Sequence, residues 1–170
     1  MPTSTSRSRP RSVGHGAGEP IGPFSLPATT HSYLARAAES LRDAVVAPDV
    51  PTRYACAHVA ALRAAAALLA ARARPSGVSS GRRRPQKNAW VLLAEVAPEL
   101  TEWATFFAAG AAKRAAAEAG STRAVTEREA DDLVRDADRF LAVVEQALGL
   151  APHVASVQLC VSPVQRTRAG

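Results

Sequence analysis

The chain has 170 residues and a formal net charge of +6, and 47% of its residues are hydrophobic while only 5% are aromatic. This length suggests a single domain that is long enough to bury a real core. Alanine and leucine dominate and strand-forming runs are nearly absent, so the composition argues against a sheet and favours helices that pack closely through small side chains. We therefore expect an all-α fold.

The first segment of the chain differs from the rest in composition. Residues 1–29 lack helical periodicity and hold five prolines among glycines and serines, which predicts a disordered extension. Apolar residues at helical spacing then predict a first helix from about Thr30 that Pro48 ends. Pro51 can open a second helix, whose apolar stripe continues to about Ala73.

A basic segment follows the second expected helix. Residues 72–87 carry six cations and no acidic residue, among glycines, serines and prolines; the cations are Arg72, Arg74, Arg82, Arg83, Arg84 and Lys87. Such a cluster can bind RNA phosphates through the release of counterions. A basic linker is just as often a solvated connector. Residues 74–87 are therefore expected to be a linker inside the domain, and whether it binds RNA stays open.

A kinked pair of helices is expected after this linker. Asn88 can cap a short helix that runs through Val96. Pro98 then opens a longer helix that reaches Ala119, and Gly120 is its C-terminal stop. The side chains of this helix expected in the core are Leu100, Trp103, Phe106, Phe107 and Ala111.

The last expected helix has the strongest start signal in the chain. Thr126 and Glu129 form a capping-box pattern, and Gly149 ends the helix. The acidic residues near its start are followed by arginines at pairing distance, so a solvated face is expected there rather than a cation site. Residues 30–149 would then form the domain, and residues 150–170 a flexible C-terminal tail.

Several kinds of chemistry find no support in the sequence. The two cysteines, Cys56 and Cys160, have no disulfide-framework spacing and suit a reducing compartment. Neither a metal site nor another cofactor is implied. No apolar run follows the basic N-terminus as a secretory signal requires, and the run from Ala64 to Ala73 is too short to span a membrane. We expect a cytoplasmic protein that does not contact a membrane.

Four stretches of the chain carry a family resemblance. They are residues 53–63 (RYACAHVAALR), 82–90 (RRRPQKNAW), 98–114 (PELTEWATFFAAGAAKR) and 124–133 (AVTEREADDL). Over roughly residues 30–149 the chain resembles the actinobacterial SAV_6107-type branch of the HEPN superfamily. The resemblance implies a compact four- to five-helix bundle that often forms a homodimer. It also implies one of two roles, because many HEPN domains are metal-independent ribonucleases with an Arg-x4–6-His motif, and others are inactive adaptors.

Within residues 30–149, only Arg53 and His58 match that motif. In the nucleases that the chain resembles, the histidine transfers a proton and the arginine stabilises the charge on the phosphate. Five residues along a helix turn the side-chain direction by about 140°, so the two side chains do not share a face. Tyr54 also stands where active members have a small polar residue. The other interpretation is that His58 lies at the edge of the core with one hydrogen bond, while Arg53 is a surface residue.

Three functions remain open from the sequence. The first is an RNA-associated or protein-interaction module without catalysis, which uses the bundle and the basic linker. The second is a metal-independent ribonuclease with Arg53 and His58 as its catalytic residues. The third is a structural partner of another protein, in which the linker is only a tether.

Overall fold

The computed structural model describes residues 25–72 and 88–154. Within these ranges all the regular secondary structure is helical; the elements are α1 (Ala28–Val46), α2 (Val50–Arg72), α3 (Ala89–Val96), the 3-10 helix η1 (Pro98–Leu100), α4 (Thr101–Glu118) and α5 (Glu127–Ala147). The expected all-α bundle of four to five helices is confirmed, and each helix begins and ends close to the residues that the sequence predicts.

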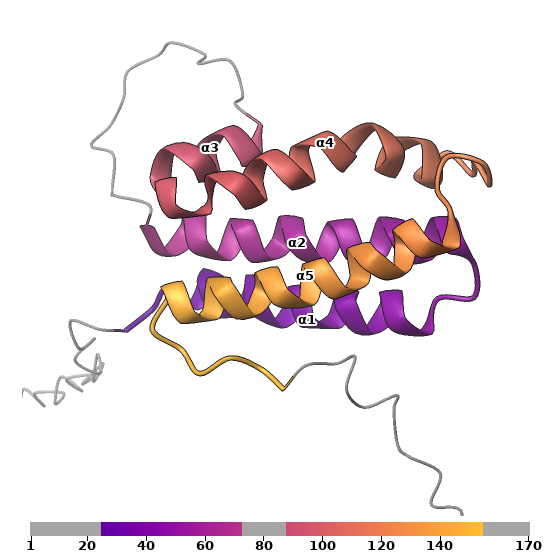
Figure 1. The fold of residues 1–170 in the computed structure, drawn as a ribbon. Helices are drawn as coiled ribbons and strands as arrows, with labels where there is room; N and C mark the ends of the chain where they lie inside the picture. Colours follow the sequence, from indigo (N-terminus) through magenta and orange to yellow (C-terminus); the bar gives the residue numbers. More distant parts are fainter. Residues whose placement is uncertain (1–24, 73–87, 155–170) are drawn as a thin grey trace, which may run out of the picture.

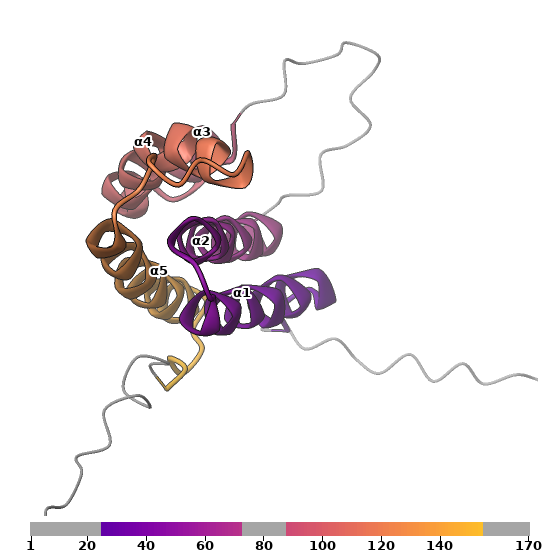
Figure 2. The same cartoon turned by 90° about the vertical axis from the view of Figure 1, so that its right-hand side faces the viewer.

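The helix α2 lies at the centre of the bundle (Figure 2). All four other α-helices contact it, with α3 and α4 on one side and α1 and α5 on the other (Figure 1). Alanines at its buried positions, such as Ala57, Ala61 and Ala64, are fully enclosed. Because a methyl group is small, the neighbouring helices can approach the backbone of α2 closely.

The length and hydropathy of α2 would also allow it to cross a membrane. An 18-residue window of this helix has a mean hydropathy of 1.5. The whole helix is therefore long and apolar enough to span a membrane, although the run from Ala64 to Ala73 alone is too short. Half of that window is buried inside the bundle. The apolar character of α2 is thus accounted for by its central place among four helices.

Local signals in the sequence define the helix ends. Asn88 accepts a hydrogen bond from the backbone N–H of Trp90, and Thr126 and Glu129 form the reciprocal capping box. Gly120 and Gly149 have φ angles of 84° and 74°, in the left-handed region that glycine adopts without strain. These four expected signals are confirmed.

The start of α2 has a cap that the sequence analysis did not identify. The carboxylate of Asp49 accepts hydrogen bonds from the backbone N–H and the hydroxyl of Thr52, at 2.8 and 2.9 Å. These two bonds lower the pKa of Asp49. Asp49 therefore fixes the first turn of α2, from which Arg53 and Tyr54 project.

The expected core face of α4 needs one correction. Leu100 and Phe107 are buried as predicted, and Trp103 is half-buried with its ring stacked on Phe107. Phe106, however, is 46% exposed, so its expected place in the core was wrong. Adjacent residues on a helix point about 100° apart. The orientation of α4 that buries Phe107 therefore turns Phe106 to the surface.

The residues after α5 fold back onto that helix. The imidazole of His153 lies 2.8 Å from a carboxylate oxygen of Glu145 and 3.1 Å from one of Asp138. The backbone N–H of His153 donates a further bond to Glu145. Residues 150–154, the first part of the expected C-terminal tail, are thus held against α5.

Candidate functional site

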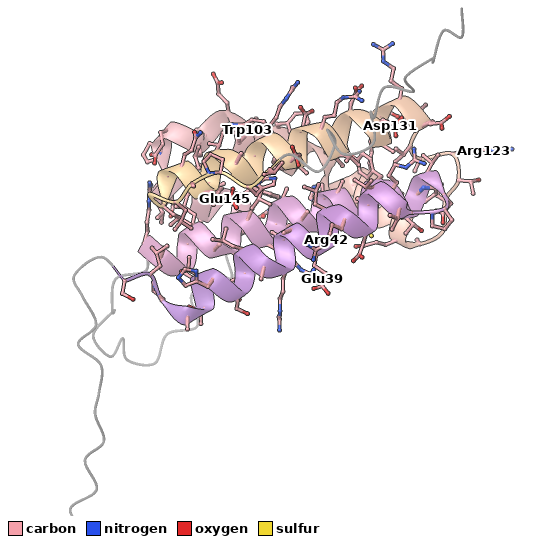
Figure 3. All side chains as sticks on the ribbon, turned by 90° about the horizontal axis from the view of Figure 1, so that it is seen from below. Glu39, Arg42, Trp103, Arg123, Asp131 and Glu145 are labelled. Carbon is pink, nitrogen blue, oxygen red and sulfur yellow. The ribbon has the colours of Figure 1, made fainter. Side chains whose placement is uncertain are left out.

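Arg53 lies in the first turn of α2 and points to α5. Its Nη1 lies 2.6 Å from a carboxylate oxygen of Asp131, which Figure 3 shows on α5. The Arg53 side chain is 22% exposed, so it is more covered than a free surface arginine. A partly exposed pair of this kind contributes about 0–1 kcal/mol to stability. The ion pair joins the start of α2 to α5.

His58 lies on α2 and points to α4 instead. Its side chain is buried, with 1% of the residue exposed, and its Nε2 lies 2.9 Å from the backbone carbonyl oxygen of Phe107. A carbonyl oxygen can only accept, so Nε2 carries the proton. The rings of Trp90 and Phe107 meet the imidazole edge-on, with centroids 5.9 and 6.0 Å away. His58 is therefore a core residue that joins α2 to α4.

The chemical state of His58 follows from this enclosure. Burial lowers the pKa of His58, more strongly than the hydrogen bond to Phe107 raises it. The imidazole is therefore neutral at pH 7. Its Nδ1 is buried and has no hydrogen-bond partner among the described residues. Within one chain, Arg53 binds α5 and His58 binds α4, so the structure does not bring the two motif residues together.

A glycine on α4 makes room for this arrangement. A Cβ atom added to Gly110 would lie 2.9 Å from the Tyr54 hydroxyl oxygen and 3.4 Å from Cδ2 of His58. Glycine inside a helix costs about 1 kcal/mol relative to alanine. Gly110 was not among the residues predicted from the sequence, although a single glycine in an alanine-rich helix indicates close packing.

An open groove lies between α4 and α5. Its volume is about 520 Å³, and its lining residues are Tyr54, Phe106, Lys113, Glu129, Asp132, Leu133, Arg135, Asp136 and Arg139. An adjoining pocket of about 320 Å³ is lined by Glu102, Trp103, Phe106 and Asp136. Phe106 and Asp136 line both hollows. This surface was not among the sites that the sequence predicted, because it depends on the spacing between two helices.

Ion pairs occupy much of the larger groove. Lys113 bonds to Glu129, and Arg135 bonds to Asp132. The Lys113 ammonium, together with the cap bonds from Thr126, lowers the pKa of Glu129 to about 2. These pairs match the solvated charged face that the sequence predicts for the start of α5. The smaller pocket differs from the groove, because its lining contains two aromatic rings and two carboxylates but no cation.

The basic segment is described only at its first residue. Nη1 of Arg72 lies 2.7 Å from a carboxylate oxygen of Glu99 and also donates to the carbonyl oxygen of Val96. Arg72 therefore joins the end of α2 to the turn between α3 and α4. The other cations of the expected RNA-binding linker, Arg74, Arg82, Arg83, Arg84 and Lys87, lie outside the described residues.

No group of three or more histidine, cysteine, aspartate or glutamate side chains that could hold a metal ion occurs in residues 25–72 and 88–154. Cys56 is half-buried in α2 with a free thiol, and Cys160 lies beyond the part of the chain that the structure describes.

Four α-helices pack around the central helix α2, which carries the Arg-x4-His motif, and together they form the compact all-α bundle expected of a HEPN-type domain. A family model for SAV_6107-like HEPN proteins matches residues 44–145, which is more than half of the chain, so the chain belongs to this family. The comparisons with curated proteins and with solved structures found no match.

Proposed function

We propose that this HEPN domain is a protein-interaction module without catalytic activity. The observation that carries the proposal is the burial of His58, whose imidazole is 1% exposed and already bonded to Phe107. A general acid or base must come within hydrogen-bonding distance of the proton it transfers. In this fold a phosphodiester cannot approach His58 unless α4 moves away from α2.

The electrostatics of His58 support the same proposal. Proton transfer near neutral pH is most efficient when the pKa of the catalytic group lies near the working pH. Burial lowers the pKa of His58 instead, and the hydrogen bond and the two neighbouring rings account for its position. Arg53, the proposed partner in catalysis, is paired with Asp131 on another helix.

The surface between α4 and α5 supports the interaction role. Phe106 is the largest exposed aromatic side chain of α4, and it borders both the groove and the pocket. Aromatic rings are enriched at protein–protein interfaces. A homodimer is one such interaction, and a different protein partner is the other.

An RNA-cleavage assay tests the proposal against the ribonuclease alternative. The full chain is incubated with single-stranded RNA in a chelator, beside the variants Arg53→Ala and His58→Gln. We expect no cleavage by the wild-type chain above the level of the variants. Cleavage that disappears in both variants, while their helix content and elution volume stay the same, would establish the ribonuclease function instead.

RNA association without cleavage is a second candidate function. It is favoured by the six cations of residues 72–87. Arg72 is already paired with Glu99, so RNA binding would depend on the remaining five. If this candidate is right, replacing Arg82, Arg83 and Arg84 by serine weakens RNA binding and reduces its salt dependence by about three counterions. Unchanged or absent affinity would favour a role for the segment as a tether.

A further inference from the structure

We propose that the pocket lined by Glu102, Trp103, Phe106 and Asp136 binds an arginine side chain of a protein partner. Below, these four residues are called the acidic aromatic pocket. The proposal rests on the interaction role proposed above, and it adds the chemistry of the partner.

Helical spacing gathers three of the four residues on α4. Trp103 and Phe106 are three residues apart and Glu102 and Phe106 four, so the three side chains lie on one face of the helix. Asp136 reaches the pocket from α5. The hollow has a volume of about 320 Å³ and is open to solvent, so a single long side chain can lie in it.

The aromatic walls of the pocket are held in place. The Trp103 ring stacks on Phe107 with centroids 5.9 Å apart, and the Phe106 ring meets Phe107 edge-on at 5.0 Å. Trp103 and Phe106 themselves are nearly perpendicular, at 89°. Because the buried Phe107 fixes both rings, a ligand would not have to order them, which favours binding.

The carboxylates of the pocket are incompletely neutralised. Glu102 has no ion-pair partner among the described residues. Asp136 has Arg139 at 3.5 Å, but the Arg139 side chain is 70% exposed. Burial raises the pKa of Asp136, which indicates that solvent stabilises this carboxylate poorly. The pocket thus presents negative charge beside two aromatic rings.

An arginine side chain complements this combination better than other protein groups do. Its planar guanidinium stacks on aromatic rings and donates to carboxylates in a forked geometry. RNA would be repelled by the two carboxylates, and an apolar side chain would offer no partner to the Glu102 carboxylate. The occupant that we assign is therefore an arginine in an exposed segment of another protein.

The test compares three labelled peptides on the full chain. The first peptide is Gly-Ser-Arg-Gly-Ser. In the other two, the arginine is replaced by lysine or by citrulline, which has the shape of arginine without its charge. Binding is followed by NMR through the indole N–H signals of Trp103 and Trp90. We expect the arginine peptide to shift the Trp103 signal and to bind about tenfold more tightly than the citrulline peptide.

Variants of the chain locate the effect. Glu102→Gln and Asp136→Asn should each weaken binding of the arginine peptide about five- to tenfold, and Phe106→Leu should weaken it as well. The matched control is Glu39→Gln, because Glu39 is an exposed acid on α1, on the other side of the bundle from Trp103 (Figure 3). The control should bind as the wild type does.

Three results would overturn the proposal. One is equal binding of the arginine and citrulline peptides. Another is a loss of affinity in Glu39→Gln as large as in Asp136→Asn. The third is tighter peptide binding after Arg82, Arg83 and Arg84 become serine, since that would make the chain's own arginines the occupant. None of these results produces RNA cleavage, so the pocket can fail while the non-catalytic role stands.

Discussion

The Nε2 atom of His58 lies 2.9 Å from the backbone carbonyl oxygen of Phe107, and this bond joins the central helix α2 to α4 inside the core. Trp90 of α3 closes over the same imidazole. The histidine of the HEPN motif therefore connects three helices in this chain.

Replacing His58 by alanine should destabilise the fold. The substitution removes a buried ring, leaves a cavity and takes away the partner of the Phe107 carbonyl, so the free energy of unfolding should fall by about 2–4 kcal/mol. Urea unfolding followed by circular dichroism measures the change. The exposed His31 on α1 provides the control, because His31→Ala should change stability by less than about 0.5 kcal/mol. Equal effects of the two substitutions would argue against a structural role for His58.

Gly110→Ala should destabilise the bundle although alanine is the better helix former. The added methyl group gains about 1 kcal/mol of helix propensity, but the clash with the Tyr54 hydroxyl costs about 1–3 kcal/mol. The same substitution in a Tyr54→Phe background, which lacks that hydroxyl, should be neutral or stabilising. A double-mutant cycle of unfolding free energies tests this coupling, and an effect of Gly110→Ala that is the same in both backgrounds would contradict it.

The neighbouring residues Phe106 and Phe107 should differ sharply in their contribution to stability. Phe107 is fully buried among five other rings, so Phe107→Ala should lower the free energy of unfolding by about 3–5 kcal/mol. Phe106 is largely exposed, and Phe106→Ala should cost about 1 kcal/mol or less. Chemical unfolding of the two variants under the same conditions compares them directly. Similar losses would mean that α4 is rotated relative to the orientation described.

Phe106 and Phe107 also show which parts of the fold could be predicted from the sequence. Local signals such as Asn88, the Thr126 capping box and Gly120 depend on neighbours a few residues away, and the helix ends could be predicted from them. Which face of α4 turns inward depends on how α4 lies against α2. The aromatic residues and alanines of α4 are spread around the helix without a strong apolar stripe, so tertiary packing decided between Phe106 and Phe107.

The candidate site was less accessible to prediction for a similar reason. The sequence shows that Arg53 and His58 cannot share a face, and their two separate partners agree with this. It cannot show that His58 is enclosed by Trp90 and Phe107, which come from two other helices. The groove and the acidic aromatic pocket arise from the distance between α4 and α5, which no local pattern encodes.

The contact of His153 with α5 should make stability depend on pH in the neutral to alkaline range. Burial alone would lower the pKa of His153, but the bonds to Glu145 and Asp138 and their charges raise it above its ordinary value. A raised pKa in the folded state adds stability that is fully present below about pH 6.5, the unfolded value, and is lost as the pH rises through the folded pKa.

The variant His153→Gln tests this dependence. It should flatten the decrease in unfolding free energy as the pH rises above about 6.5, whereas His31→Gln should leave the decrease as it is in the wild type. Parallel pH profiles for the wild type and His153→Gln would show that the contact does not form in solution.

The central claim is that His58 is a buried, neutral core residue, and an NMR titration of the histidine side chains tests it most directly. In the full chain labelled with ¹⁵N, we expect His58 to be neutral with its proton on Nε2, this proton to exchange slowly with water, and the ring to become charged only below pH 6.5. His58→Gln assigns the signal. A His58 ring that titrates near pH 6.5 and exchanges its protons as fast as exposed His31 would contradict the account and restore His58 as a candidate catalytic residue.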